Sequence, residues 1–180
     1  MENPEAAALK FNEEAEHYLT QGNFEKAYAT CLKALELVPY FAPASNTIGQ
    51  IMEKIDALDS AIDWYDKALE KQPNLAELHA NLGKIYVKQQ QFHKAITCYE
   101  IATKLQPNFA DAYRALAQIW HQIDKPELAA SCWYKALNLK PEWATDLEYL
   151  KLAKTLLKYQ LKKEAIACYD QRHNFMHDWG

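Results

Sequence analysis

The sequence predicts an all-α fold built from repeated helix–turn–helix units. Prolines recur every 34 residues, at Pro39, Pro73, Pro107 and Pro141. Within each period, apolar residues follow the steps of three and four that are typical of amphipathic helices. Only 4 glycines occur among 180 residues, which is too few for the many tight turns of a β-rich fold. A fixed period of this length indicates a repeat architecture.

Other positions recur with the same period, and they share one property: they hold either a small residue or a large, mostly aromatic one. The columns are Ala27, Ala61, Ala95 and Ala129; Ala34, Ala68, Ala102 and Ala136; and Cys31, Tyr65, Tyr99 and Trp133. Gly49 and Gly83 occupy a further small column. Two helices approach closely only where side chains are small, so we expect these glycines to receive an aromatic ring from the partner helix.

Each period contains two helices in this interpretation. In the third unit, residues 76–89 and 92–105 both carry apolar residues at helical spacing. Pro107 should end the second of them, because proline lacks the backbone N–H and restricts the residue before it. Pro126 falls where a second helix should begin, and the first turn of a helix tolerates proline.

The third unit carries Leu82, Gly83, Tyr86, Ala95 and Tyr99 in this order. With these residues the chain resembles the tetratricopeptide repeat (TPR) family, whose pattern is W-x2-L-G-x2-Y, then A-x3-F, then P. The units of the single array, 1–180, are 8–41, 42–75, 76–109, 110–143 and a degenerate fifth, 146–175, which is offset by two residues. The resemblance implies a right-handed superhelical solenoid, whose first helices line a concave groove that binds a segment of a partner protein.

The groove positions follow from the phase of the first helices, because they lie opposite the residues that pack on the second helices. The candidates for partner binding are Asn12, Asn46, Gln50, Lys84, Arg114, Gln118, His121 and Lys154. Lys84, Arg114 and Lys154 favour a partner with an acidic segment. Glu16 and Glu53 should make the other end of the groove acidic. The alternative is that these side chains are only a solvated lining.

One branch of the family grips the acidic C-termini of chaperones with a set of lysine, asparagine and arginine side chains. In this sequence the corresponding positions hold Asn46, Gln50, Asn81, Asp111 and Ala115. Only Asn81 matches, so we expect no chaperone-tail clamp.

The sequence offers no arrangement for catalysis, and we expect neither an enzyme nor a cofactor or metal site. No nucleophile elbow, phosphate loop or dinucleotide fingerprint occurs. Cys98 and Cys132 recur on successive second helices, about 8–10 Å apart, too far for a disulfide. His173 and His177 could share a helix face, but no third ligand accompanies them.

The composition points to a soluble protein with protein partners. The formal net charge of −4 is too mild to indicate nucleic acid as a partner. No run of about 18 apolar residues could span a membrane. The N-terminus, MENPEAAALK, lacks the apolar region of a secretory signal, so we expect a cytoplasmic location.

The function that the resemblance implies is that of an adaptor or scaffold. One alternative is a regulatory or substrate-recruiting N-terminal module of a larger enzyme. A second alternative is a structural homo-oligomer, joined through Phe175, Met176 and Trp179 in the C-terminal HNFMHDWG. An uncovered apolar face at the end of a repeat array favours self-association.

Overall fold

The chain, seen in a computed structural model, is helical throughout its described part. The description covers the backbone of residues 3–177 and the side chains of residues 3–145 and 147–170. No residue of 3–177 lies in a β-strand. The elements are α1 (Pro4–Thr20), α2 (Phe24–Leu37), α3 (Ala42–Lys54), α4 (Leu58–Lys71), α5 (Ala76–Lys88), α6 (Phe92–Leu105), α7 (Ala110–Gln122), α8 (Pro126–Leu139), the short 3₁₀ helix η1 (Pro141–Trp143), α9 (Asp146–Lys158) and α10 (Lys162–His177).

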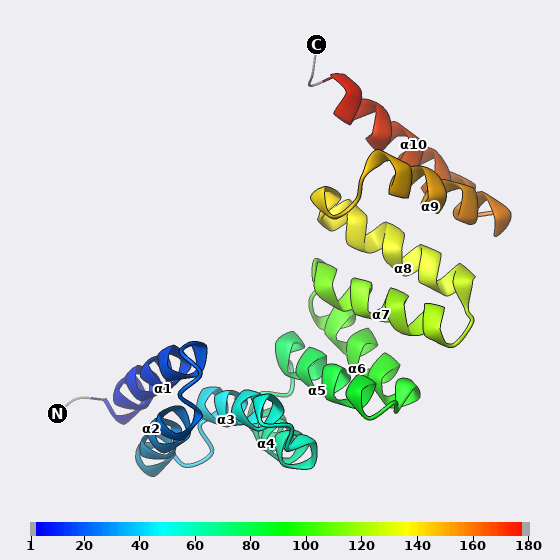
Figure 1. The fold of residues 1–180 in the computed structure, drawn as a ribbon. Helices are drawn as coiled ribbons and strands as arrows, with labels where there is room; N and C mark the ends of the chain where they lie inside the picture. The colour runs from blue at the N-terminus through cyan, green and yellow to red at the C-terminus, as the bar shows by residue number, and fades with distance from the viewer. Residues whose placement is uncertain (1–2, 178–180) are drawn as a thin grey trace. The chain divides into compact units, whose positions relative to one another are not determined.

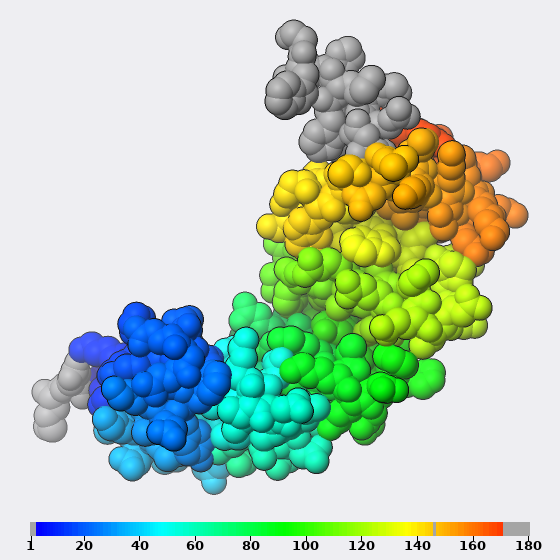
Figure 2. Space-filling view, viewed as in Figure 1, coloured from blue at the N-terminus to red at the C-terminus, as the bar shows by residue number. Residues whose placement is uncertain are grey.

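The helices form hairpins within two compact units, Met1–Cys98 and Tyr99–Gly180. In the first unit α1 pairs with α2 and α3 with α4, and α3 packs against both α1 and α2 (Figure 1). Figure 2 shows the blue surface of α1 and α2 in contact with the cyan surface of α3. In the second unit α7 pairs with α8, α9 pairs with α10, and α9 packs on α8. The predicted all-α solenoid is confirmed, whereas one continuous array over 1–180 stays a prediction.

The helix boundaries lie close to those that the sequence predicts. The third unit holds α5 and α6, and α6 ends at Leu105, two residues before Pro107. Pro126 is the first residue of α8, where its missing N–H costs no helical hydrogen bond. Prolines therefore end one helix and begin another at the expected points.

The small columns let paired helices approach each other. Every alanine of the two columns is at most 5% exposed. Gly49 on α3 faces the ring of Tyr65 on α4, and a Cβ added at Gly49 would lie 2.5 Å from the nearest ring atom. The expectation that a glycine here receives an aromatic ring is thus confirmed for Gly49. Tyr65 is fully buried in consequence.

The turn inside each hairpin has a residue in the left-handed backbone conformation at the same position. A positive φ recurs in these turns at Gly22, Asp56, Gln90, Asp124 and Gln160. Each closes a pair of hydrogen bonds back into the preceding helix; in the first turn Asn23 N–H donates to the Tyr18 carbonyl (2.9 Å) and Gly22 N–H to that of Leu19 (3.0 Å). This is the Schellman pattern, which satisfies the last carbonyls of a helix. Only the first turn has the glycine that the conformation favours.

The connection between α8 and α9 differs from the others. Residues 38–41, 72–75 and 106–109 join the earlier hairpins, whereas residues 140–145 join α8 to α9. The two extra residues account for the offset of the fifth unit in the sequence. This connection contains η1, which places Trp143 beside the second unit's own helices.

Adding a methyl group at Gly49 should destabilise the first unit. The variant Gly49→Ala forces the Tyr65 ring to shift, at a cost of about 1–3 kcal/mol. The higher helix propensity of alanine offsets about 1 kcal/mol of that cost. Thermal unfolding followed by circular dichroism should show a lower Tm, whereas Lys54→Ala at an exposed position of the same helix should change stability by less than about 0.5 kcal/mol. An unchanged Tm for Gly49→Ala would contradict the tight ring contact.

Placing glycine at a left-handed turn should have the opposite effect. Gln90→Gly removes the strain of a side chain at φ 58° and should stabilise the chain by about 0.5–1 kcal/mol. Gln91→Gly is the matched control, because Gln91 does not have a positive φ and gains nothing from glycine. Equal effects of the two changes on Tm would show that backbone strain at residue 90 is unimportant.

Candidate interaction surface

Polar side chains tie the first helices of the first unit to one another. Between α1 and α3, the Thr47 hydroxyl donates a buried hydrogen bond of 2.9 Å to the Asn12 side-chain oxygen. The Asn12 amide nitrogen in turn donates to Glu16 at 2.9 Å. Asn12 is only 3% exposed, so both ends of its amide are occupied within the fold. It therefore positions α1 against α3.

Between α3 and α5 the same kind of contact continues. Asn81 Nδ2 donates to Asn46 Oδ1 at 3.1 Å. About two turns further along α3, Glu53 Oε1 lies 2.7 Å from Lys84 Nζ and 3.0 Å from Lys88 Nζ. We call Asn46, Glu53, Asn81, Lys84 and Lys88 the α3–α5 polar row. Its members join two successive first helices and remain partly open to solvent, apart from Glu53.

The Glu53 carboxylate is the electrostatic centre of the α3–α5 polar row. Its side chain is 8% exposed, whereas those of Lys84 and Lys88 are 54% and 37% exposed. Burial raises the pKa of Glu53, but the hydrogen bonds and charges of Lys84 and Lys88 outweigh burial and lower its pKa overall. Glu53 is therefore ionised at neutral pH. Two ammonium groups share one carboxylate, which leaves a net positive charge at the surface.

The groove candidates of the first unit fall into two kinds. Asn46, Gln50 and Lys84 are partly or well exposed, whereas Asn12 is buried. The expectation that Glu53 makes its end of the groove acidic is wrong, because Lys84 and Lys88 neutralise it. The phase argument did not single out Lys88, although it lies four residues after Lys84 and hence on the same helix face.

The groove candidates of the second unit do not share one contact network. Arg114 on α7 pairs with Asp111 at 2.6 Å, and its guanidinium lies 4.5 Å from the centre of the Trp143 ring. Gln118, His121 and Lys154 are exposed. Arg114 is thus held by its own unit. Helical phase could not predict this contact, because Trp143 belongs to the longer α8–α9 connection.

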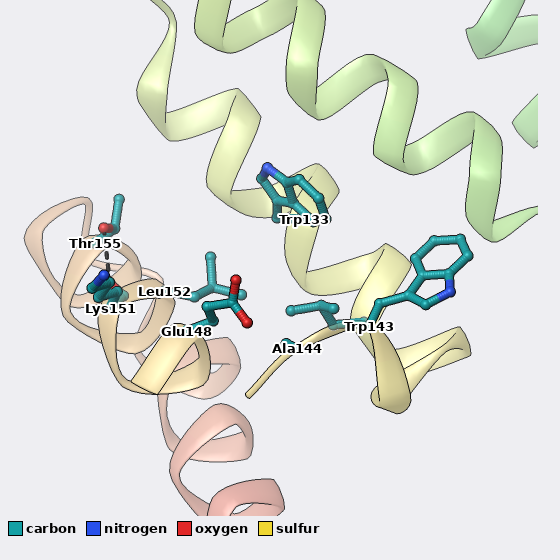
Figure 3. A pocket seen from close by; sticks show the side chains of 8 residues that line it. Trp133, Trp143, Ala144, Glu148, Lys151, Leu152 and Thr155 are labelled. Atoms are coloured by element: carbon teal, nitrogen blue, oxygen red, sulfur yellow. Dashed lines mark hydrogen bonds between the residues drawn. The ribbon is translucent and has the colours of Figure 1, made fainter. Parts of the chain in front are cut away.

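A cavity of about 260 Å³ opens beside Trp143 in the second unit. Trp133 and Leu137 of α8 form one side, and Leu152 and Thr155 of α9 form another (Figure 3). Glu148 and Lys151 are its charged lining residues. No repeat column predicted this cavity.

The cysteines are free thiols with little reactivity. Burial raises the pKa of Cys31 to about 12 and that of Cys168 to about 11. Burial likewise raises the pKa of Cys98 and of Cys132 to about 11. Because the thiolate is the nucleophile and the metal ligand, these side chains are poorly suited to either role at neutral pH.

Neither a metal cluster nor a membrane-spanning helix is found among the described residues. Among their side chains, no three His, Cys, Asp or Glu come together in a way that could hold a metal ion. None of their helices is long and apolar enough to cross a membrane. The predicted self-association residues lie outside these limits: the side chains of Phe175 and Met176 are not described, nor is any part of Trp179.

The comparison with protein families identifies the repeat. Residues 57–90 and 83–124 match the TPR repeat family. Residues 57–124 therefore carry tetratricopeptide repeats. Among curated protein sequences, none matches the chain significantly.

Solved structures share the fold. PilF of Pseudomonas aeruginosa is 24% identical, with a TM-score of 0.76 over 96% of this chain and 78% of that one. MamA of Desulfovibrio magneticus RS-1 is 18% identical, with a TM-score of 0.68 over 96% of both chains. YrrB, described as a TPR protein with an unusual peptide-binding site, is 21% identical, with a TM-score of 0.66 over 95% of this chain and 87% of that one. Identities this low establish the fold alone, and this fold is typical of protein–protein interaction modules.

Removing the Glu53 charge should weaken the first unit in a pH-dependent way. Because the pKa of Glu53 is lowered by folding, its contribution to stability is present above the ordinary carboxyl pKa of about 4.3 and is lost as the pH falls through the lowered value. We expect Glu53→Gln to cost about 1–3 kcal/mol at pH 7 and much less at pH 3.

Urea unfolding of the wild type and of Glu53→Gln at pH 7, 4 and 3 would measure the difference in their free energies of unfolding. Glu36→Gln, at an exposed position of α2, is the matched control and should follow the wild type at every pH. A difference between Glu53→Gln and the wild type that stays constant down to pH 3 would show that the Glu53 charge does not hold α3 to α5.

Proposed function

We propose that this chain is an adaptor or scaffold module that binds an acidic segment of a partner protein on the first helices of its first unit. The contacts would come from Asn46, Gln50 and Lys84, with Lys88 added by its place in the α3–α5 polar row. Asn12 would act indirectly, by holding α1 in place.

One observation carries this proposal: Lys84 and Lys88 share the single carboxylate of Glu53 and keep a net positive charge. Lys84 remains 54% exposed although it is paired, so its ammonium group can donate to a second acceptor. A partner carboxylate could therefore bind without displacing Glu53. Side-chain amides at Asn46 and Gln50 can hydrogen-bond the backbone of an extended segment.

The fold adds general support. TPR arrays present extended surfaces built from successive repeats, and such surfaces bind partner chains. YrrB, which shares the fold, is described as having a peptide-binding site. Sites on a common fold still differ in chemistry, so the acidic preference rests on the lysines of this chain.

The groove candidates of the second unit form a separate proposed surface. Gln118, His121 and Lys154 are exposed and available to a partner, whereas Arg114 already pairs with Asp111. We expect Arg114 to contribute less to capture of an acidic segment than Lys84.

Neutralising Lys84 should weaken binding of acidic peptides selected against the protein. The probe is a set of acidic peptides of twelve residues, chosen by display on the wild-type chain and measured by fluorescence anisotropy. Lys84→Gln leaves Lys88 to pair with Glu53, so the fold should persist while affinity falls about fivefold to tenfold, as expected for a charged hydrogen bond.

Lys67→Gln, which removes an exposed lysine on the second helix α4, is the matched control and should retain affinity. Equal loss in both variants would mean only general charge attraction. Full affinity of Lys84→Gln would refute the proposed surface.

A further inference from the structure

The cavity beside η1 is mainly apolar and lies within the second unit. The lining residues are Trp133, Leu137, Trp143, Ala144, Glu148, Lys151, Leu152 and Thr155. Its volume of about 260 Å³ equals that of about nine water molecules at about 30 Å³ each. A single long side chain therefore fits inside it.

The cavity lies where the repeat spacing is interrupted, at the longer connection between α8 and α9. Trp133 belongs to the same column as Tyr65, which is fully buried in the first unit. Trp133 is only partly buried, and Trp143 of the longer connection packs against the same apolar cluster. The Trp133 indole thus forms a wall of the opening.

The Glu148 carboxylate, on one wall of the cavity, is held in a fixed position. Glu148 Oε2 accepts hydrogen bonds from Thr145 N–H at 2.7 Å and from the Thr145 hydroxyl at 2.9 Å, as part of the capping box of α9. These bonds lower the pKa of Glu148 and keep it ionised. Oε1 has no hydrogen-bond partner within the described residues. Figure 3 shows the carboxylate of Glu148 between Leu152 and Ala144, with Trp133 on the opposite wall.

The chain already places cations on partly buried tryptophan rings. Arg114 lies over Trp143 at 4.5 Å, and Lys67 lies over Trp64 at 4.0 Å. Trp133 has no such cation within the described part of the chain. Its indole faces the cavity instead, close to a fixed carboxylate.

We propose that this cavity receives an arginine side chain of a partner protein. The apolar walls suit the aliphatic stem of arginine, and the planar guanidinium can stack on indole while it pairs with a carboxylate. Such stacking is favoured for arginine, and Glu148 supplies the opposite charge. Lys151 also lines the cavity, and the cation of the partner would pair with the Glu148 carboxylate rather than lie beside the Lys151 ammonium group. This site is independent of the acidic-segment surface on the first unit.

Nuclear magnetic resonance of the full chain can test the proposal. The probe is N-acetyl-arginine methylamide, whose blocked ends imitate a residue within a chain. The indole N–H signals of Trp133 and Trp143, assigned with Trp133→Phe and Trp143→Phe, should shift and saturate. We expect the uncharged isostere N-acetyl-citrulline methylamide to bind at least about fivefold more weakly, because it lacks the cation.

Glu148→Gln separates the charge from the fold, because glutamine can keep the capping box. This variant should lose about tenfold in affinity for the arginine probe, which corresponds to one charge-assisted contact. Glu142→Gln removes a nearby exposed carboxylate that does not line the cavity and should change affinity by less than about twofold.

Four results would overturn the proposal. N-acetyl-leucine methylamide binding as tightly as the arginine probe would indicate a site for apolar side chains. Free arginine binding more tightly than the blocked probe would indicate a small-molecule site. Unshifted indole signals with every probe, or full affinity of Glu148→Gln, would show that the cavity takes no cation.

Discussion

The close approach of paired helices is the constraint on which the rest of this structure depends. Gly49 leaves space for the Tyr65 ring, and buried alanines recur wherever second helices meet their neighbours. A hairpin packed this closely buries only one face, so further hairpins must cover the other. The polar contacts between first helices can form only because this packing sets their separation. Where the packing changes, at the α8–α9 connection, a ring from the same column is left partly open.

The fold was predictable because its signal is repeated. Prolines, alanines and rings at a spacing of 34 residues predicted two helices per unit, and in the third unit the predicted limits lie within one residue of the observed ones. The left-handed turns were harder to predict. Glycine is the usual residue in this conformation, but Asp56 and Gln90 occupy these positions instead. The two extra residues before α9 were visible in the alignment of the units. Their consequence was not, because a 3₁₀ turn and the placement of Trp143 depend on tertiary contacts.

The candidate surface was predictable in outline only. Helical phase identified Asn46, Gln50 and Lys84, because residues three or four apart share a face. Phase says nothing of contacts between helices, so it missed that Asn12 is buried under Thr47 and that Glu53 is shared by two lysines. Those contacts reverse the expected local charge from acidic to basic. A single sequence does not show how neighbouring helices are offset along their axes, and this offset decides which side chains come into contact.

The protonated state of the cysteines has a practical consequence for labelling. All four thiols have a raised pKa, about 11 or 12, because burial disfavours the thiolate. A cysteine introduced at an exposed helix position would keep an ordinary pKa of about 8.5 and hold several hundred to several thousand times more thiolate at neutral pH. Maleimide dyes could therefore be attached to one chosen position while the native cysteines stay in place. Fluorophore pairs for distance measurements between the two units become accessible without disturbing the packing that the native thiols complete.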